Sequence, residues 1–463
     1  MGEAGQRGRL FGTDGVRGVA GQDLTAPLAM DLSVAAAAVL GGEADRTPGA
    51  GPAVAVVGRD PRTSGEFLEA AVVAGLASAG VQVLRLGVIP TPGVAYLTRA
   101  LGAAFGVVIS ASHNPAQDNG IKFFGRGGVK LPDAVEDQIE ARLMEGAGGS
   151  LSPARPVISF GQVSEASAEH ERYLDYLLST LPGQAGRALA GLRVVADCAH
   201  GAAYRIAPRA LRRAGADVIA IGVEPDGQNI NAGYGSTCLG TLAAAVLEHG
   251  ADAGVAYDGD ADRCLAVDAD GQLLDGDHIL AVLATELKES GRLAHDAVVV
   301  TVMANQGFHV AMREAGITVI ETPVGDKYVS AAMRDGGYVL GGEQSGHIIL
   351  LEHATTGDGI LTSLQLLAAV NRRGMPMSAA AKMVRKYPQV LVNVPGDASR
   401  LGPRVDAAVS RAESALGDNG RVLVRPSGTE PAIRLMVQAA DADLAEQVIG
   451  QLAAEVRLAL AGQ

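Results

Sequence analysis

The sequence predicts an α/β fold with three similar domains on mixed or parallel sheets, followed by a smaller C-terminal α+β domain. Three observations predict this fold. The chain has 463 residues, too many for one hydrophobic core, because a domain usually holds roughly 100–200 residues. One local pattern occurs three times before residue 321. The remaining part of the chain shows a different order of elements.

The repeated pattern is an Ala-Gly pair followed by a short apolar run. Each copy comes after a helical-looking run. Gly at a helix C-terminus adopts the left-handed conformation without steric cost, and the β-branched residues that follow suit a buried strand. The three copies are Ala79–Leu84, Ala214–Ile219 and Ala315–Ile320.

Strands and helices are expected to alternate around each copy, with helices from about Ser64 and over Pro92–Leu101 near the first. Such alternation predicts right-handed βαβ units and parallel strands. Repeats of this length indicate duplicated domains and not solenoid units. The expected strands are Ala53–Val57, Phe105–Ile109, Leu192–Ala196, Gly254–Tyr257, Val298–Val302 and Tyr338–Leu340.

The C-terminal part is expected to form three strands and two helices. The two prolines Pro388 and Pro395 favour a domain boundary just upstream. The expected strands are Val390–Val394, Arg421–Val424 and Ile433–Val437, and the expected helices are Arg404–Leu416 and Asp443–Leu460. The four domains are therefore expected over residues 1–165, 166–268, 269–380 and 381–463.

Composition and charge argue against several classes of partner. A formal net charge of −13 repels nucleic acids and anionic lipids, and aromatic residues, at 3%, are too few for a base-stacking platform. No signal peptide or membrane span of about 20 apolar residues is evident. Cys198, Cys238 and Cys264 lack metal-ligand spacing and predict a cytoplasmic protein with reduced thiols. An anionic ligand would need basic groups gathered at its own site.

Polar loops follow the ends of several predicted strands, where ligands bind in open α/β sheets. The first is Ser110–Pro115, and beyond it lies Lys122. Ser112 beside His113 would suit a nucleophile. Taken alone, this Ser-His pair is more typical of a capped turn, and only the other loops shift the interpretation.

The second loop, Asp258-Gly259-Asp260-Ala261-Asp262-Arg263, predicts a metal site. Three carboxylates held close together repel one another, and a hard divalent cation such as Mg²⁺ or Ca²⁺ relieves this repulsion. An EF-hand is the rival interpretation. It fails because Arg263 stands where that loop needs Gly, and Ala269 where it needs Glu. Open coordination positions favour a catalytic Mg²⁺ that takes a phosphate oxygen, with Arg263 placed to pair with the same anion.

Two later loops suit a sugar and a phosphate. Gly342–His347 offers donors and acceptors for sugar hydroxyls, although a polar turn fits equally well. Arg425–Pro431, with Arg434 beyond it, combines backbone N–H groups, hydroxyls and guanidinium groups in an anion nest; a tight hairpin with surface arginines is the alternative. Three further stretches could touch the ligand or simply form turns: Phe11–Gly18, Arg59–Ser64 and Thr322–Lys327.

Together these loops resemble the α-D-phosphohexomutase superfamily, from about Leu10 to about Leu460. The Ser-His-Asn-Pro, Asp-Gly-Asp-x-Asp-Arg, Gly-Glu-x-Ser-Gly-His and Arg-x-Ser-Gly-Thr-Glu-Pro signatures occur in the family's order. The Phe-Gly-Thr-Asp-Gly-Val-Arg-Gly opening and Gln344 are similar to the phosphoglucosamine branch of that superfamily. No motif position departs from the pattern in a way that suggests an inactive copy.

The resemblance implies four domains around a central cleft, the last of them mobile, and a role for each matching residue. Ser112 would be the phosphoserine, and its phosphate oxygen would join Asp258, Asp260 and Asp262 as a metal ligand. The other implied roles fall to Arg17, Lys122, Arg263 and His347 at the reacting centre, Glu343 and Ser345 at the sugar hydroxyls, and Arg425, Ser427, Gly428, Thr429 and Arg434 at the non-transferring phosphate.

The implied reaction interconverts glucosamine 6-phosphate and glucosamine 1-phosphate, which feeds amino-sugar nucleotide and cell-wall precursor synthesis. Phosphoserine 112 would phosphorylate O1, giving glucosamine 1,6-bisphosphate as intermediate and activator, and the O6 phosphoryl group would return to Ser112. One Mg²⁺ per active site, with Arg263 and Lys122, would neutralise the transferring group. The implied partner is a small hexosamine phosphate, with no nucleic acid or membrane, and the implied oligomer is a homodimer.

The residues themselves leave three alternatives open. The same chemistry on phosphoglucose or phosphomannose fits every spacing argument. A serine phosphatase also uses Ser, metal and Arg, but it would not require separate loops for a sugar and a far phosphate. A non-catalytic phosphosugar sensor would not require an intact Ser112 and three aspartates.

Overall fold

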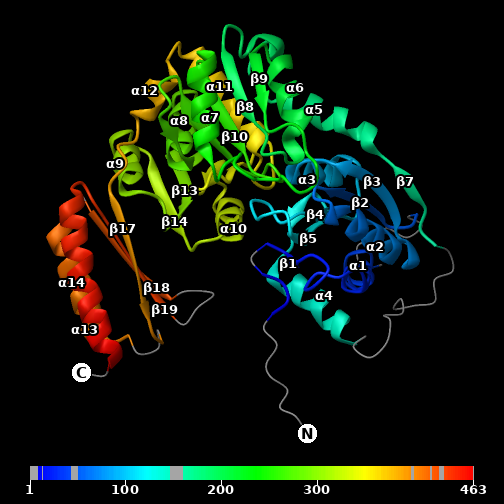
Figure 1. Ribbon diagram of the computed structural model, residues 1–463, viewed down its shortest axis with the longest axis horizontal. Helices are drawn as coiled ribbons and strands as arrows, with labels where there is room; N and C mark the ends of the chain where they lie inside the picture. Colours follow the sequence, from blue (N-terminus) through cyan, green and yellow to red (C-terminus); the bar gives the residue numbers. More distant parts are fainter. Residues whose placement is uncertain are drawn as a thin grey trace. The chain divides into compact units, whose positions relative to one another are not determined.

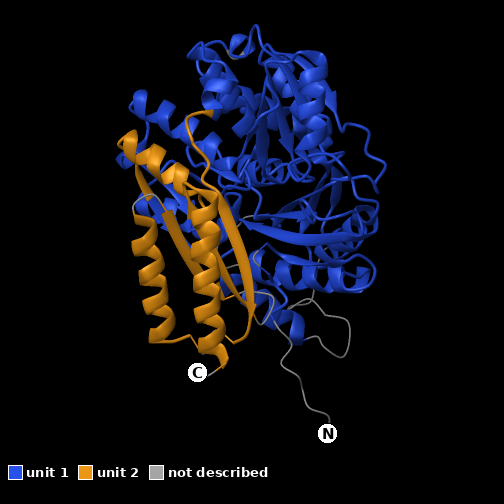
Figure 2. Ribbon diagram, turned by 60° about the vertical axis from the view of Figure 1, so that its left-hand side comes forward, with its two compact units in different colours: residues 1–302, 320–381 blue, residues 303–319, 382–463 orange. Residues whose placement is uncertain are grey.

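The computed structural model describes residues 9–12, 14–42, 51–145, 160–397, 401–417, 420–426 and 432–461. The chain divides into two compact units (Figure 2). Unit 1 comprises Met1–Val302 and Ile320–Ala381, and unit 2 comprises Met303–Val319 and Lys382–Gln463. In the described part of the chain, no helix combines the length and apolar character that a membrane span requires.

The first sheet of unit 1 has seven strands in the order β1-β5-β4-β2-β3-β7, with β6 paired to β5. Strands β4, β2, β3 and β7 run parallel, and β5 is antiparallel to both β4 and β1. Helix α3 covers one face, while α1, α2 and α4 lie along the other (Figure 1). Because both faces are covered, β4 is buried at every position. The elements are β1 Val16–Val19, α1 Ala26–Leu40, β2 Val54–Arg59, α2 Ser64–Ser78, β3 Gln82–Val88, α3 Thr91–Ala100, β4 Phe105–Ile109, β5 Asp118–Gly125, β6 Val129–Lys130, α4 Asp133–Glu145 and β7 Val163–Glu165.

The second sheet has five strands in the order β12-β11-β10-β8-β9. Strands β10, β8 and β9 are parallel, and β11 is antiparallel to β10. Its core packs Leu242 and Val246 of α7 against the sheet. The elements are α5 His170–Ser179, β8 Arg193–Asp197, α6 Ile206–Arg213, β9 Asp217–Ile221, α7 Leu239–His249, β10 Ala253–Tyr257, β11 Cys264–Asp268 and β12 Leu273–Leu274.

The third sheet has four strands in the order β14-β13-β15-β16, with β13 and β15 parallel and β16 antiparallel to β15. Val329 and Met333 of α10 pack against it. The elements are α8 Gly276–Glu289, β13 Ala297–Thr301, α9 Gln306–Glu314, β14 Thr318–Thr322, α10 Asp326–Gly336, β15 Leu340–Gly342, β16 Ile348–Leu350, α11 Gly359–Arg372 and α12 Met377–Ala381.

The three sheets share one connection, which confirms the predicted repeat. In each, a buried parallel strand is followed by a polar loop and then by an antiparallel neighbour: β4 to β5, β10 to β11, and β15 to β16. The repeated glycines also behave as predicted. Gly80, Gly215 and Gly316 have φ values of +82°, +105° and +65°, the left-handed region that Gly adopts without steric cost.

Unit 2 contains a three-stranded antiparallel sheet in the order β17-β19-β18. Helices α13 and α14 pack on one face of it, and together they form a continuous apolar core that includes Leu435, Val437 and Ile449. This is the smaller α+β domain predicted from the sequence. The elements are β17 Gln389–Pro395, α13 Pro403–Leu416, β18 Gly420–Pro426, β19 Ala432–Ala439 and α14 Ala442–Ala461.

One strand lies later than expected. The sequence predicts a strand over Tyr338–Leu340, whereas β15 spans Leu340–Gly342. Two consecutive glycines are typical of a loop, but here Gly341 and Gly342 pair with Val299 and Val300 of β13. A Cβ atom on Gly341 would lie 2.6 Å from Met333 Sδ and 2.8 Å from Val299 O. Only glycine, which has no side chain, therefore permits this close packing of the strand.

Asp197, at the end of β8, gives the fold a pH-dependent stability. Its buried carboxylate accepts hydrogen bonds from the N–H groups of Ala199 (2.9 Å) and Gly235 (2.8 Å), yet burial raises the pKa of Asp197 to about 6. Because the folded state binds this proton more tightly than the unfolded chain does, the stabilisation is complete below about pH 4 and is lost as the pH rises through about 6.

We predict that Asp197→Asn flattens the dependence of unfolding free energy on pH between about pH 4 and 6, by an amount on the order of 2 kcal/mol. Denaturant titrations at several pH values measure this slope. Asp270→Asn is the control, because Asp270 is exposed on the turn after β11. A slope for Asp197→Asn equal to that of the wild type would contradict the prediction.

Candidate active site

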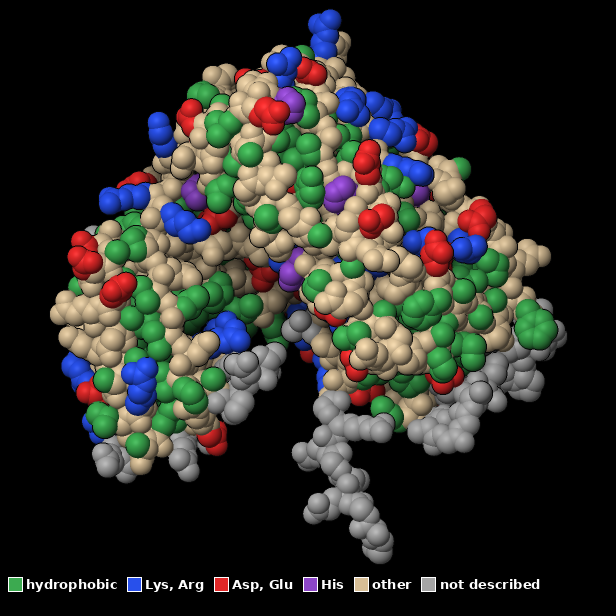
Figure 3. Space-filling view, in the orientation of Figure 1, with side chains coloured by type: hydrophobic (Ala, Val, Ile, Leu, Met, Phe, Trp, Pro, Cys, Tyr) green, Lys and Arg blue, Asp and Glu red, His purple; other side chains and the backbone are tan. Residues whose placement is uncertain are grey.

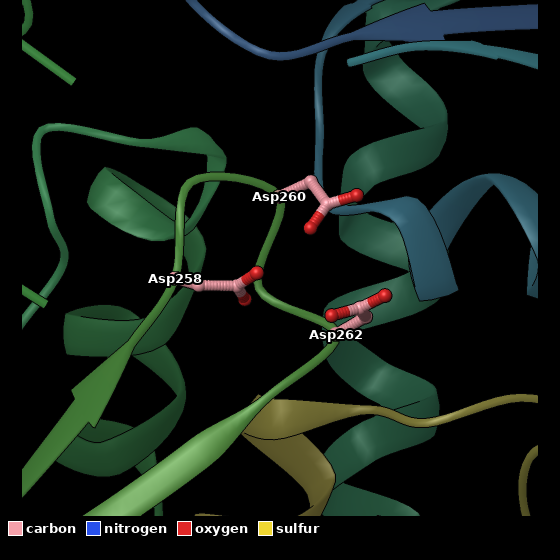
Figure 4. A group of neighbouring side chains, drawn as sticks. All are labelled: Asp258, Asp260 and Asp262. Atoms are coloured by element: carbon pink, nitrogen blue, oxygen red, sulfur yellow. The ribbon is translucent and has the colours of Figure 1, made fainter. Parts of the chain in front are cut away.

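A loop between β10 and β11 brings three carboxylates together. Asp258, Asp260 and Asp262 each offer an oxygen atom, and these atoms lie within 4.8 Å of one another. The three side chains come from one tight loop and point toward a common region (Figure 4). Ala261 has φ +57°, and this left-handed residue helps to close the loop. All three aspartates are buried.

The donor set fits a divalent metal ion. Burial, together with the neighbouring aspartates, raises the pKa of Asp258 and of Asp262. Among the described residues, Asp260 Oδ1 and Asp262 Oδ1 are buried without a hydrogen-bond partner. Buried carboxylate oxygens are normally paired or bound to metal. A divalent cation would relieve the repulsion between these carboxylates and would bind their unpartnered oxygen atoms.

Ser112 lies beside this cluster although it is 146 residues away along the chain. It is buried in the loop after β4, and its Oγ–H donates to Asp258 Oδ2. Its backbone has φ +52°, the left-handed region that non-glycine residues rarely occupy. His113 Nδ1 lies 3.2 Å from Ser112 Oγ. Burial, followed by the charges of Arg263 and Arg17, lowers the pKa of His113 to about 4, so this ring is neutral near pH 7.

Basic side chains line the other side of the aspartates. Lys122, on β5, places Nζ 3.0 Å from Asp260 Oδ2 and 2.6 Å from Asp14 Oδ2. Arg17, on β1, also pairs with Asp14. Lys130 Nζ lies 3.0 Å from Asp14 Oδ1. Antiparallel pairing of β1 with β5, which sets Arg17 opposite Gly120, brings these groups to one edge of the sheet.

These charges tune one another strongly. Burial would raise the pKa of Asp14, but Lys122, Lys130 and Arg17 lower it well below its usual value. Burial would likewise lower the pKa of Lys122, but Asp14 and Asp260 raise it. Asp14 therefore stays ionised and Lys122 stays charged near pH 7. The site holds fixed charges of both signs, which suits transfer of a highly charged group.

The Gly342–His347 loop is joined directly to the metal loop. The Cys264 N–H donates to Gly346 O at 3.0 Å, and Arg263 and His347 form an antiparallel bridge. Gly346 has φ +90°, and a Cβ there would lie 2.4 Å from Cys264 O, so only glycine permits this approach. His347 Nε2 lies 3.4 Å from Asp326 Oδ2 and 3.9 Å from the Asp262 carboxylate.

Unpartnered buried atoms gather at this point. Within the described residues, Arg17 Nε, Arg263 Nε and both ring nitrogens of His347 are buried without a hydrogen-bond partner. Burial would lower the pKa of Arg263, but Asp262 and Asp258 raise it, so its guanidinium group is charged. Buried donors without partners favour a polar ligand that supplies acceptors.

Glu343 and Ser345 are partly exposed on the same loop. Ser345 Oγ donates to Glu343 Oε2 at 3.4 Å, and Glu343 Oε1 accepts from the Gly325 N–H at 3.3 Å. The loop therefore presents a carboxylate and a hydroxyl beside the buried charges. Such groups bind the hydroxyls of a sugar by accepting and donating hydrogen bonds.

Unit 2 carries the two remaining arginines. Arg425 on β18 and Arg434 on β19 are directly paired in the sheet, beside a pocket of about 330 Å³ that also includes Met303, Leu391 and Asn393. Burial and the charge of Arg434 lower the pKa of Arg425. Among the described residues neither guanidinium group has an acidic partner, which suits an anion. Ser427, Gly428 and Thr429 lie outside the described residues.

Basic side chains also gather over α5 and α6, with acidic side chains beside them (Figure 3). Arg209 pairs with Glu171 at 2.7 Å, and Arg213 pairs with Asp175 at 2.8 Å. These groups are exposed and already neutralised by their partners. Because these arginines already pair with carboxylates, they do not indicate a second anion site.

Comparison with known proteins identifies the family. Four protein-family models match the chain in succession: the phosphoglucomutase/phosphomannomutase alpha/beta/alpha domains I, II and III and the C-terminal domain of the same family. They cover residues 8–147, 171–271, 275–387 and 377–455 respectively.

Full-length relatives are also close in sequence. A phosphoglucosamine mutase from Thermobifida fusca is 62% identical over 452 residues, which cover 97% of this chain and 98% of the relative. A phosphoglucosamine mutase from Acidothermus cellulolyticus is 59% identical over 453 residues, which cover 97% and 96%. The chain belongs to the phosphoglucomutase/phosphomannomutase family.

Solved structures of phosphohexomutases have the same fold. A phosphoglucomutase/phosphomannomutase family protein from Burkholderia thailandensis superposes with a TM-score of 0.80 at 23% identity, covering 97% of both chains. A putative phosphomannomutase from Thermus thermophilus gives a TM-score of 0.73 at 25% identity, covering 96% of this chain and 98% of the other. The family models and the full-length relatives confirm the predicted superfamily, and these structures agree with the predicted fold.

Sequence reasoning missed several residues that this phosphohexomutase brings to the site. Asp14 and Asp326 lie in stretches that were noted only as possible ligand contacts. Lys130 and Thr91 received no prediction. Lys130 pairs with Asp326, and Thr91 donates from Oγ1 to Asp260 Oδ2 at 2.7 Å. Glycines lie beside Asp14 and Asp326, but glycines also precede Lys130 and prolines flank Thr91, so these turn residues alone did not distinguish site positions from ordinary turns.

We predict that divalent cations stabilise this phosphohexomutase and that Asp262→Asn removes most of the effect. The substitution keeps the size of the side chain but deletes one negative charge, so Mg²⁺ affinity should fall by about tenfold or more. Calorimetric titration and the rise in thermal midpoint with Mg²⁺ measure the loss. Asp270→Asn, on an exposed turn, should bind Mg²⁺ as the wild type does. An unchanged Mg²⁺ response in Asp262→Asn would remove this carboxylate from the metal site.

Proposed function

We propose that this protein interconverts glucosamine 6-phosphate and glucosamine 1-phosphate through a phosphorylated Ser112. The observation that carries the proposal is the hydrogen bond from Ser112 Oγ to Asp258, because it joins a hydroxyl to a buried aspartate triplet across 146 residues of sequence. The full-length relatives named phosphoglucosamine mutase support the amino sugar as substrate. A fungal neighbour at 20% identity, an N-acetylphosphoglucosamine mutase from Aspergillus fumigatus, was solved with GlcNAc-6P and magnesium.

The proposed metal is Mg²⁺, held by Asp258, Asp260, Asp262 and a phosphate oxygen of phosphoserine 112. When bound, it would withdraw charge from the transferring phosphoryl group. Lys122 and Thr91 hold Asp260 in place, with Nζ and Oγ1 at 3.0 Å and 2.7 Å from its Oδ2. The protein therefore fixes the orientation of its carboxylates before a substrate arrives.

In the first transfer, the bond between phosphorus and Ser112 Oγ breaks and a bond between phosphorus and the sugar O1 forms. The O1 hydroxyl loses its proton to a base of the site, and Ser112 Oγ regains a proton. The product of this step is glucosamine 1,6-bisphosphate. Arg17, Lys122, Arg263 and His347 are the proposed groups for clamping phosphate and moving these protons. Lys122 pairs with Asp260, and the other three carry buried nitrogen atoms that have no partner among the described residues.

In the second transfer, the bond between phosphorus and the sugar O6 breaks and a bond between phosphorus and Ser112 Oγ forms. Ser112 Oγ loses its proton to a base of the site, O6 gains a proton, and glucosamine 1-phosphate is the product. Glu343 and Ser345 are the proposed contacts for sugar hydroxyls. Arg425, Ser427, Gly428, Thr429 and Arg434 are the proposed site for the phosphate that is not being transferred. Arg425 and Arg434 lie opposite each other in the sheet and have no acidic partner among the described residues, which supports this role.

The proposal extends to the organisation of the protein. We retain domain limits at residues 1–165, 166–268, 269–380 and 381–463, a homodimer, and a cytoplasmic location. The free thiols of Cys198, Cys238 and Cys264 are consistent with a reducing compartment.

Ser112→Ala should reduce isomerisation by more than about a hundredfold, because alanine has no oxygen atom to carry the phosphoryl group. A coupled assay of glucosamine 1-phosphate formation measures this loss, and intact mass measures phosphate on the protein. Ser78→Ala, on α2, is the matched control. Isomerisation by Ser112→Ala at the wild-type rate would rule out a mechanism through phosphoserine 112.

Relative turnover on three sugar phosphates tests the substrate. We predict that the wild type has a kcat/KM for glucosamine 6-phosphate at least about tenfold above those for glucose 6-phosphate and mannose 6-phosphate, an advantage of roughly 1.4 kcal/mol. Net release of inorganic phosphate should be slow beside isomerisation. Equal use of all three sugars would replace the proposed substrate, and rapid phosphate release would indicate a phosphatase.

A further inference from the structure

Arg62 is a fully buried arginine whose side chain contacts the loop that carries Ser112. The stretch Arg59–Ser64 was expected to touch the ligand or form a turn, but Arg62 has no exposed surface with which to meet a ligand. Its guanidinium group instead donates five hydrogen bonds. They run from Nε to Asp60 Oδ2 (2.9 Å), from Nη2 to Ser112 O (2.9 Å) and Asn114 O (2.8 Å), and from Nη1 to Asp118 O (3.0 Å) and Pro115 O.

The acceptors explain why an arginine is needed. Four of them are backbone carbonyl oxygens of one loop, all turned inward toward the same plane. Carbonyl dipoles aimed at one point repel one another, and a buried carbonyl without a donor is costly. The planar guanidinium group offers five N–H donors in a fixed fork, whereas the ammonium group of lysine offers three and no plane.

Asp60 ties the other side of the Ser112 backbone into the same network. Its Oδ2 also accepts a hydrogen bond from Ser110 Oγ, and Ser110 Oγ in turn accepts from the Ser112 N–H at 2.9 Å. The N–H group and the carbonyl of Ser112 are therefore both held. This matters because Ser112 has φ +52°, which a serine retains only where its surroundings impose it.

A second donor reaches the same carbonyls from the second sheet's domain. Asn231 Nδ2 lies 3.0 Å from Ser112 O and 3.1 Å from Asn114 O. The Thr63 N–H, next to Arg62, donates to Gly227 O at 3.0 Å. The segment that includes Gly227 and Asn231 therefore fastens the serine loop to the domain that carries the metal loop.

We propose that Arg62, oriented by Asp60, is a positioning residue that holds Ser112 in its left-handed conformation so that Oγ stays directed at the aspartate triplet. This inference rests on the proposed function, since it assigns a role in phosphoryl transfer from Ser112. Arg62 has no exposed surface with which to touch a substrate. It acts through the backbone of Ser112, and a displacement of about 1 Å at a reacting atom costs about a hundredfold in rate.

Single-turnover transfer tests the role. Protein phosphorylated on Ser112 is mixed with glucosamine 6-phosphate, and intact mass follows loss of the phosphoryl group with and without the sugar. For Arg62→Lys we expect the transfer rate constant to fall about tenfold or more, while the KM stays within about twofold and hydrolysis in the absence of sugar does not slow. Arg85→Lys is the control, because Arg85 on β3 pairs, among the described residues, with Glu69 and Glu165 and not with the Ser112 loop.

Ser110→Ala is the second variant and decides the matter if Arg62→Lys does not fold. It deletes the one oxygen that links Asp60 to the Ser112 N–H and leaves a small side chain in place. We expect a lower transfer rate constant with an unchanged KM. Folded variants that transfer at the wild-type rate, even with lowered thermal midpoints, would overturn the positioning role. Wild-type protein that transfers nothing to the sugar would overturn the proposed function instead, and this inference with it.

Discussion

Burial of like charges at short range is the constraint on which the rest of the site depends. Asp258, Asp260 and Asp262 would repel one another in a low-dielectric interior, and their buried oxygens are only partly satisfied by the protein. Lys122 offsets part of this repulsion from one side, and Arg263 does so from the other. A divalent metal ion would complete the balance. The surrounding loops are shaped to supply these countercharges.

A repeated connection explains how countercharges from distant segments reach one place. In each of the first three sheets a parallel strand runs into a polar loop and returns antiparallel. Repetition of that unit gives three loops of the same kind, and each loop carries different chemical groups. The first carries the hydroxyl of Ser112, the second carries the carboxylates of Asp260 and its neighbours, and the third carries the ring nitrogens of His347. The backbone bond from Cys264 to Gly346 then locks two of the loops together.

Local sequence was sufficient for features whose chemistry is contained in a few consecutive residues. The Asp-x-Asp-x-Asp spacing marked the metal loop, and the Ala-Gly pairs marked helix ends that do take positive φ. Lys130 and Arg62 were beyond such reasoning, because their partners Asp326 and Asn114 are brought near by tertiary packing alone. From sequence alone, a charged residue between an apolar strand and a helix is expected to be exposed, because charged side chains are rarely buried.

The left-handed backbone at Ser112 also restricts which hydroxyl amino acid this position can hold. Threonine offers the same oxygen and similar acidity, but its branched Cβ clashes with the backbone at positive φ. Replacement of Ser112 by threonine would therefore require the backbone of this loop to leave its left-handed conformation. Aspartate and asparagine tolerate such geometry better, so a charged mimic of the phosphorylated state is sterically more accessible at this position than the nearest chemical homologue.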